Sequence, residues 1–463
     1  MAETTLWAAR AWVEGAWQDR VVLRIDTRGC WAEVRVHADP PPGATVLDGP
    51  ALPGMVNAHS HAFQRAFAGM AEQRAAGQDD FWSWRDRMYA VALRVTPEQQ
   101  QAIAAQLYAE LLRGGYTHVC EFHYLHNALD GAHYAPAITR MADALADAAL
   151  EVGMGLTLLP TVYERAGFTS TGLREDQRRF RADAQTVAAM RRQLRQRHAG
   201  TAGALVRVGA ALHSLRAATP EAVAQLAADG DAGPLHIHVA EQVSEVDDCR
   251  AATGQRPIEW LASTVALDGR WQLVHATHAT PGEIAAVARS GAGVVICPTT
   301  EANLGDGLVD LPGWLTAGVS IALGSDSHVC RSVAEELRLL EYGQRLAQRV
   351  RCVGAAPDSG EPSTAARLFN LALRGGAAAA GFAQWGLEPG ARADLLVIDT
   401  GAHALLGVPP AHVLDALVFS SPARPFRDVM VAGKWATRAH RSARATGVAA
   451  RFTAAMHELH GRA

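Results

Sequence analysis

The sequence predicts an α/β protein in which a (β/α)8 barrel carries a small β-sandwich built from both ends of the chain. Three observations predict this fold. Through the middle of the chain, apolar β-branched runs alternate with stretches of helical periodicity. Short strands separated by turns occupy the N-terminal segment and return near the C-terminus. Polar, reactive side chains follow several of the middle strands, and a barrel brings the carboxyl ends of all its strands to one mouth.

The middle of the chain supplies the barrel. A doubly wound open sheet is the alternative, but it would string the reactive residues along a crevice. Threonine followed by proline at 219–220 and 280–281 predicts two helix starts. We expect strands at 51–58, 115–121, 152–160, 205–212, 234–240, 271–276, 291–298 and 319–324, with helices between them at, for example, 96–113, 136–150, 176–197, 219–229, 255–267 and 281–289.

The two ends of the chain supply the small sandwich. Its N-terminal strands are expected within residues 5–50, in the runs VVLRI and AEVRVHA. Its later strands are expected at 393–400, 414–420 and 427–435. The predicted domain limits are 1–50 and 376–440 for the two parts of the sandwich, 51–375 for the barrel, and 441–463 for a C-terminal helical tail.

Composition excludes several classes of protein. The chain has 463 residues, 49% hydrophobic and 19% charged, which is too apolar for a disordered chain. The net charge is −4 and no basic cluster stands out, so we expect no nucleic-acid partner. No apolar run reaches the roughly 18–20 residues of a bilayer span, so we expect no membrane partner.

The N-terminus and the cysteines bear on location. The opening MAETTLWAARAWVEG has no apolar core of the signal-peptide type, which predicts a cytoplasmic protein. Six cysteines are scattered singly without a C-x-x-C pair, so neither a disulfide framework nor a cysteine-rich zinc module is expected.

Histidines at strand ends suggest a metal site. His59 and His61 are two residues apart on the first barrel strand, so their imidazoles point the same way. Later strands end in the run HIHVAE at 236–241, in His275 and in Asp326. Imidazoles and a carboxylate suit zinc or iron. Each histidine alone is equally well explained as a hydrogen-bonded strand end, but that explanation is weak for all of them together.

These motifs resemble those of the amidohydrolase superfamily, in its deaminase branch, whose members have a (β/α)8 barrel with a small sandwich made from both chain ends. The resemblance implies that His59, His61, His238 and Asp326 are the metal ligands. It makes His236 the less favoured ligand in the HIHVAE run, and it places His275 beside the bound water.

The resemblance also bears on metal stoichiometry. Binuclear amidohydrolases bridge two metals with a carboxylated lysine after the fourth strand. The only lysine of this chain is Lys434, far outside the expected barrel, and residues 210–214 read AALHS. We therefore expect one divalent metal per chain, Zn²⁺ with Fe²⁺ as the alternative.

A closer resemblance is to the formimidoylglutamate deiminases of this superfamily, which convert N-formimino-L-glutamate to N-formyl-L-glutamate and ammonia. It extends over nearly the whole chain, and the Phe-Gln-Arg extension of the H-x-H strand is its most selective part. The matching segments are LPGM (52–55), NAHSHAFQR (57–65), FWSWR (81–85), EFHY (121–124), HSLR (213–216) and CPTTEANLGDG (297–307).

The substrate side of the site follows from the resemblance and from charge. A small dicarboxylate substrate needs fixed cations, and guanidinium groups bind carboxylates in a bidentate manner. The resemblance selects Arg85, expected on the loop after the first strand, and Arg216, just beyond the fourth. Gln64, Tyr124 and His213 would add hydrogen bonds. The alternatives are an Arg85 that packs on a neighbouring tryptophan at the surface and an Arg216 in a salt bridge that flanks a helix.

The implied mechanism gives roles to three residues. Asp326 takes the proton of the attacking water, while His275 orients that water. Glu241 protonates the imino nitrogen and then the departing ammonia.

Three alternatives stay open from the sequence. One is a nucleobase-type deaminase with the same metal residues, another is a deiminase of a guanidino-dicarboxylate, and the third is a non-catalytic binding protein of the same fold. A homodimer is the expected assembly. Glu301 and Asp306 are expected on a glycine-rich loop, and their roles are open. Also open are the roles of His328 and of the histidines at 118, 123, 126 and 133, for which solvated or supporting positions are expected.

Overall fold

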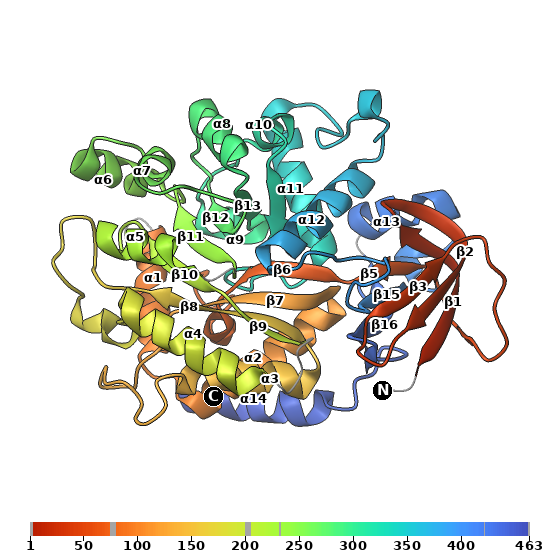
Figure 1. The fold of residues 1–463 in the computed structure, drawn as a ribbon, viewed down its shortest axis with the longest axis horizontal. Helices are drawn as coiled ribbons and strands as arrows, with labels where there is room; N and C mark the ends of the chain where they lie inside the picture. The colour runs from red at the N-terminus through yellow and green to blue at the C-terminus, as the bar shows by residue number, and fades with distance from the viewer. Residues whose placement is uncertain (1–2, 75–79, 200–204, 231–232, 421, 462–463) are drawn as a thin grey trace.

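The computed structural model describes residues 3–74, 80–199, 205–230, 233–420 and 422–461. They form two sheets, a parallel barrel at the centre and a smaller sheet at one end, with helices around the barrel (Figure 1). Within these residues, no helix is both long enough and apolar enough to cross a bilayer.

Parallel strands in sequential order make the barrel, which confirms the predicted fold. The first and last strands of this order meet at a seam, where the bridge between Ser60 and Asp326 joins them. The barrel is therefore nearly closed. Its strands are β6 (Met55–Ser60), β7 (Tyr116–His123), β8 (Gly155–Val162), β10 (Ala210–Ser214), β11 (Leu235–Val239), β12 (Trp271–His275), β13 (Gly293–Ile296) and β14 (Ser320–Leu323), with the short β9 (Val206–Val208) paired to β8.

Helices follow the barrel strands, and several begin where the sequence predicts. Thr219 and Thr280 accept hydrogen bonds from the first turns of α5 and α8, each with proline at the first position. The long helix expected at 176–197 is instead a 3₁₀ turn at Glu175–Phe180 followed by α4. The helices are α1 (Phe81–Ala92), α2 (Pro97–Arg113), α3 (Arg140–Val152), α4 (Ala184–His198), α5 (Pro220–Ala228), α6 (Val243–Thr253), α7 (Pro257–Thr264), α8 (Pro281–Ser290), α9 (Pro298–Leu304), α10 (Leu311–Thr316), α11 (Val333–Gln348), α12 (Thr364–Ala379), α13 (Val413–Phe419) and α14 (Ala445–His460).

The single strand expected at 51–58 is two strands in two different sheets. Residues Ala51–Pro53 form β5 of the small sheet, and β6 of the barrel begins at Met55. Gly54 lies between them, and a Cβ there would stand 2.2 Å from the Thr117 hydroxyl oxygen. Only glycine fits this crossing from one sheet to the other without a shift of Thr117.

Both ends of the chain contribute to the small sheet, as predicted. Side chains from its N-terminal and C-terminal strands share one hydrophobic core, which includes Leu6, Leu23, Leu395 and Met430. The sheet runs in the order β17-β16-β15-β5-β1-β2-β3. Its strands are β1 (Thr4–Val13), β2 (Ala16–Ile25), β3 (Trp31–Arg35), β4 (Thr45–Val46, paired to β1), β5, β15 (Leu395–Ile398), β16 (Phe426–Val431) and β17 (Lys434–Thr437).

One predicted strand of the small sheet is wrong. Residues 414–420 lie in helix α13 and the residue that follows it, and Leu414, Leu417 and Val418 are its buried face. Spacings of three and four residues are helical, but in a short apolar run such as LDALVF they are hard to distinguish from a buried strand.

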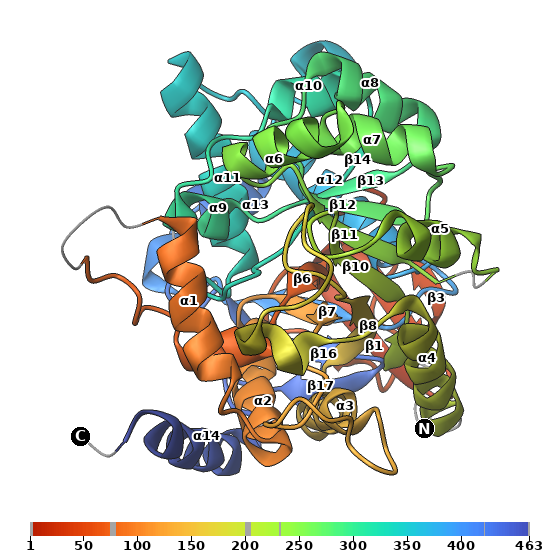
Figure 2. The ribbon, with the colours of Figure 1, turned by 90° about the vertical axis from the view of Figure 1, so that its left-hand side faces the viewer.

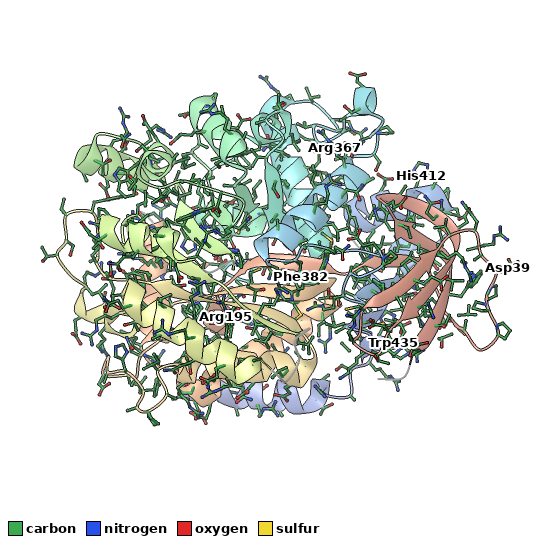
Figure 3. The ribbon with its side chains drawn as sticks, in the orientation of Figure 1. Asp39, Arg195, Arg367, Phe382, His412 and Trp435 are labelled. Carbon is green, nitrogen blue, oxygen red and sulfur yellow. The ribbon has the colours of Figure 1, made fainter. Side chains whose placement is uncertain are left out.

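The small sheet meets the barrel at an aromatic and charged joint. Phe382 lies there (Figure 3), with its ring 4.9 Å from that of His118 on β7. Arg392 lies over Phe382, and it is paired with Asp394 at 2.6 Å. His118 therefore contributes to the joint between the two parts.

Two helices from the C-terminal part of the chain pack against the barrel. Helix α12 runs across residue 375 and packs against β14 and β6. Helix α14 lies along α2 (Figure 2), where His460 donates a hydrogen bond to the carbonyl of Ala66, just after the H-x-H strand.

Candidate active site

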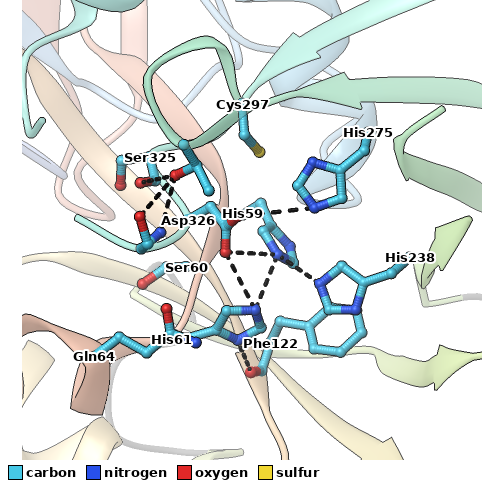
Figure 4. A network of polar contacts seen from close by, with 12 residues as sticks. His59, Ser60, His61, Gln64, Phe122, His238, His275, Cys297, Ser325 and Asp326 are labelled. Carbon is cyan, nitrogen blue, oxygen red and sulfur yellow. Dashed lines mark hydrogen bonds and ion pairs between the residues drawn. The ribbon is translucent and has the colours of Figure 1, made fainter. Parts of the chain in front are cut away.

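Four side chains from three barrel strands converge at the mouth of the barrel (Figure 4). The Nε2 atom of His59 lies 3.1 Å from that of His61 and 2.9 Å from that of His238. The Oδ1 atom of Asp326 lies 3.4 Å and 3.3 Å from the Nε2 atoms of His59 and His61. All four residues are buried.

The backbone fixes which nitrogen of two imidazoles carries the proton. His61 Nδ1 lies 2.8 Å from the carbonyl of Phe122, and His238 Nδ1 lies 2.7 Å from the carbonyl of His213. A carbonyl can only accept, so each Nδ1 donates and each Nε2 keeps a bare lone pair. These two lone pairs both face the Nε2 atom of His59. That nitrogen can carry only one proton, so it cannot donate a hydrogen bond to both of them.

A metal ion would resolve this arrangement. Burial holds the pKa of His59 and His238 well below the usual range, so both imidazoles are neutral and could serve as ligands. Ligand nitrogens about 2.0–2.1 Å from a tetrahedral metal lie roughly 3.3 Å apart, close to the spacing found here. Each Nδ1–H bond to a carbonyl is also the usual support of a metal-ligating histidine. The residues present therefore fit a divalent cation.

The fold brings these ligands together from strand ends. His59 lies on β6 and His61 follows it, whereas His238 lies on β11. Asp326 follows β14 with φ of +44°, a left-handed conformation that is unfavourable for a residue other than glycine. His275 at the end of β12 shares this feature, with φ of +68°.

Glu241 and His275 stand beside the ligand cluster. His275 Nε2 lies 3.8 Å from Glu241 Oε1 and 3.7 Å from Asp326 Oδ2. Burial raises the pKa of Glu241 to about 7, although His275 and Arg216 favour its ionised form. Burial lowers the pKa of His275, but Glu241, Glu301 and Asp326 outweigh it and raise that pKa to about 10. A carboxyl group with a pKa near 7 can both give and take a proton at neutral pH.

One pocket holds nearly all the side chains that the sequence selects. His59 lies beneath it, fully buried. The selected side chains that line the pocket are His61, Gln64, Arg85, Tyr124, His213, Arg216, His238, Glu241, His275 and Asp326.

Two arginines of the pocket, Arg85 and Arg216, both lie near the ring of Trp82. The guanidinium carbon of Arg85 lies 4.5 Å from the ring centre of Trp82, and that of Arg216 lies 5.6 Å from it. Each guanidinium group has a carboxylate at ion-pair range but not at hydrogen-bond distance, Asp86 at 3.8 Å from Arg85 and Glu241 at 3.9 Å from Arg216. Burial lowers the pKa of Arg216, but Glu245 and Glu241 outweigh it and raise that pKa. Both Nε atoms are buried and have no hydrogen-bond partner within the described part of the chain. Both arginines therefore donate no hydrogen bond to these carboxylates and remain able to donate to a bound anion.

Arg85 lies on helix α1, not on a loop as expected from sequence. Packing on Trp82, which was the alternative explanation for Arg85, occurs together with a place in the pocket.

Hydrogen bonds order the polar side of the pocket. Gln64 donates to the hydroxyl of Tyr124 at 3.1 Å, and the His213 ring lies 4.4 Å from that of Tyr163. The hydroxyl groups of Tyr163 and Tyr89 are 3.1 Å apart.

Sequence analysis missed one wall of the pocket. Phe81, Trp84, Met88 and Tyr89 line it together with Arg85, all from α1. Their spacing of three, four, seven and eight residues from Phe81 is that of one helix face, and this periodicity in FWSWRDRMY was the available signal.

The structure shows the polar contacts of several residues whose roles the sequence left open. His236 points away from the ligands, with Nε2 2.8 Å from the carbonyl of Ala379. Glu301 lies on helix α9 and not on a glycine-rich loop, and its Oε1 atom is 3.2 Å from His275 Nδ1. Asp306, just after α9, accepts a hydrogen bond from Gln242.

The histidines near β7 are supporting residues. His126 donates to the carbonyl of Thr161 at 2.9 Å and stacks edge-on against His123. His133 contacts the side-chain oxygen of Asn127 at 2.7 Å.

Imidazoles and a carboxylate at the mouth of a parallel barrel are typical of metal-dependent hydrolases of the amidohydrolase family. The chain belongs to this family, whose sequence model matches residues 51–436. Among characterised proteins, it is 46% identical to the formimidoylglutamate deiminase of Pseudomonas aeruginosa, over 98% of this chain and 99% of that protein. It is 31% identical to the 8-oxoguanine deaminase of the same organism, over 83% of this chain and 81% of that enzyme.

A solved structure agrees with this placement. The crystal structure of an amidohydrolase from Brucella melitensis matches with a TM-score of 0.93 at 40% identity. The match covers 98% of this chain and 99% of the Brucella chain.

Proposed function

We propose that the protein hydrolyses N-formimino-L-glutamate to N-formyl-L-glutamate and ammonia, a reaction of histidine degradation. The observation that carries the proposal is that the guanidinium groups of Arg85 and Arg216 line the same pocket as the ligand cluster and have no carboxylate at hydrogen-bond distance among the described residues. A dianionic substrate can offer one carboxylate to each of them. The identity of 46% to the Pseudomonas deiminase supports the same substrate.

The cofactor we propose is one divalent metal per chain, zinc in preference to iron. His59, His61, His238 and Asp326 would hold it, because their ligand atoms converge and their protonation suits a cation. The only lysine, Lys434, lies on β17 of the small sheet, which supports a single-metal centre. Such an ion supplies Lewis acidity, which makes a water molecule acidic enough to react near neutral pH.

The chain's own residues would then move the protons. Asp326 takes a proton from the attacking water, and His275, held by Glu301 through Nδ1, orients that water. The water oxygen adds to the formimino carbon. Glu241 protonates the imino nitrogen, takes the proton of the new hydroxyl group and gives it to the same nitrogen. The C–N bond to that nitrogen then breaks to release ammonia, and the proton held by Asp326 restores Glu241. The result is a formyl group in place of the formimino group, with one water consumed.

The substrate would lie between the two walls of the pocket. Arg85 and Arg216 each bind one carboxylate, and Trp82 fixes the planes of both guanidinium groups. Gln64, Tyr124 and His213 add hydrogen bonds between these arginines and the reacting carbon.

Two other substrates are the alternatives. A guanidino-dicarboxylate would use the same arginines, so charge alone does not separate it from the formimino compound. A nucleobase is disfavoured, because a base edge carries no carboxylate to pair with the two arginines of the pocket. The 8-oxoguanine deaminase is also less similar, at 31% identity.

Ammonia release tests the proposal. Purified protein loaded with zinc should release ammonia from N-formimino-L-glutamate at least about a hundredfold faster, by kcat/KM, than from guanine or cytosine. N-guanidino-L-glutamate, assayed beside them, separates the two dicarboxylate substrates. A faster reaction with either base, or with the guanidino compound, would overturn the assignment.

We also propose that the protein is a homodimer and that it is located in the cytoplasm. Exposed apolar side chains on and beside the last turns of α11, Leu346 and Val350 among them, support an interface there.

A further inference from the structure

A row of five buried polar side chains crosses the seam of the barrel. Asn57 and Ser60 lie on β6, Glu121 lies on β7, and Ser325 and His328 lie in the segment after β14. None of the five is more than 1% exposed. Four of them lie within two residues of His59, His61 or Asp326 in the sequence, and none of the five lines the pocket.

Four hydrogen bonds join these side chains end to end. The Asn57 amide donates to Ser325 Oγ at 2.7 Å, and Ser325 Oγ lies 3.0 Å from His328 Nδ1. His328 Nε2 lies 3.2 Å from Ser60 Oγ, which donates to Glu121 Oε2 at 2.7 Å. The hydrogen-bond chain passes from β6 to the segment after β14, then back to β6, and ends on β7.

The backbone fixes the direction at the asparagine end. The N–H of Ser325 donates to Asn57 Oδ1 at 2.9 Å, so the amide NH₂ group must face the Ser325 hydroxyl. That hydroxyl accepts from Asn57, and its single hydrogen is free for His328 Nδ1. His328 is then the tautomer with its proton on Nε2.

The carboxylate fixes the direction at the other end. His328 donates from Nε2 to Ser60, so the Ser60 hydrogen goes to Glu121. The backbone N–H of Ala62 donates to the second oxygen of Glu121 at 2.6 Å, and the hydroxyl of Tyr108 adds a side contact at 3.1 Å. Every hydrogen in the chain has one acceptor, so no link can reverse independently of the others.

We propose that this hydrogen-bond chain, from Asn57 to Glu121, holds the ligands of the metal centre in position. It spans the seam beside the Ser60–Asp326 bridge, where backbone hydrogen bonds also join His59 and His61 to residues 325 and 326. It ties the strand of His59 and His61 to the loop of Asp326.

The backbone of that loop is strained, so the hydrogen-bond chain has a conformation to stabilise. Asp326 and His328 have φ of +44° and +63°, conformations that L-residues persist in only when their surroundings determine them. The five residues are therefore positioning residues, because they act on the ligands and do not touch the substrate.

The inference rests on the metal centre of the proposed function but not on its substrate, so its test uses metal release. Metal-free protein is loaded with Co²⁺, and release to excess EDTA is followed by the visible absorption of the ion. Ser60→Ala, Ser325→Ala and Glu121→Gln should each release cobalt roughly 10–100-fold faster, as expected when support of a ligand is lost. The Ser60→Ala/Ser325→Ala double variant should be no faster than the faster single variant, because both break one unit.

Tyr108→Phe is the matched control, since it removes a hydroxyl bonded to Glu121 without breaking the chain. It should stay within about threefold of the unchanged protein. Release at the unchanged rate in all three variants, multiplied effects in the double variant, or an equal effect of Tyr108→Phe would overturn the proposal. The near-isosteric Glu121→Gln carries the test if the alanine variants do not fold.

Discussion

Glu241 is the residue on which the proposed proton transfers depend. Its carboxylate lies 3.8 Å from His275 and 3.9 Å from Arg216, two groups that would by themselves keep it ionised. Burial outweighs them and raises the pKa of Glu241 to about 7. A carboxyl group with an ordinary pKa would hold a proton too rarely at neutral pH to protonate the imino nitrogen.

Glu241→Gln should separate binding from proton transfer. The amide keeps the shape of the side chain but cannot shuttle a proton, so kcat should fall at least about a hundredfold. Metal content, measured by elemental analysis, should stay at the level of the unchanged protein, because Glu241 is not among the four ligands. Near-normal turnover with the metal in place would show that another group moves the proton.

Arg85 and Arg216 should each bind one carboxylate of the substrate. Hydrogen bonds to charged groups contribute about 1.5–3 kcal/mol, so kcat/KM should fall roughly tenfold to a few hundredfold in Arg85→Met or Arg216→Met. The loss should vanish when the matching carboxylate of the substrate is replaced by an amide.

The measurement is a double cycle of unchanged and variant protein against acid and amide substrates. Additive, independent losses for both arginines would mean that neither contacts a carboxylate.

For the secondary-structure elements, the sequence predicts where strands lie better than it predicts to which sheet each strand belongs. Alternating patterns locate the barrel strands, and Thr-Pro pairs locate the starts of α5 and α8. The run 51–58 reads as one strand because its apolar character is continuous, whereas the change of sheet at Gly54 depends on contacts with Thr117 far along the chain. The helix at Val413–Phe419 was missed because seven residues are too few to establish a period.

Gly54→Ala tests the crossing between the two sheets. The added methyl group would meet the Thr117 side chain, and overpacking of this kind costs about 1–3 kcal/mol. The midpoint of thermal unfolding of the metal-free protein should therefore fall. Gly167→Ala is the control, because nothing lies within 4 Å of its Cβ position and its midpoint should stay unchanged. An unchanged midpoint in Gly54→Ala would mean that Thr117 moves aside freely.

At the scale of the whole molecule, strand-end residues are what sequence predicts best about the site. A parallel barrel gathers strand ends at one mouth, so the fold alone implies that His59, His238 and Asp326 meet. Residues that support them were not predictable. Glu121 and Ser325 carry no spacing signal, because their partners lie 61 and 268 positions away.

The protein should be a hydrolase that uses one metal ion per chain on a formimino-dicarboxylate. Stepwise addition of Zn²⁺ to chelator-treated protein, with ammonia release from N-formimino-L-glutamate as the readout, tests it most directly. Activity should be absent without metal, rise linearly and level off at one equivalent per chain. Activity that needs no metal, or that levels off only at two equivalents, would contradict the account.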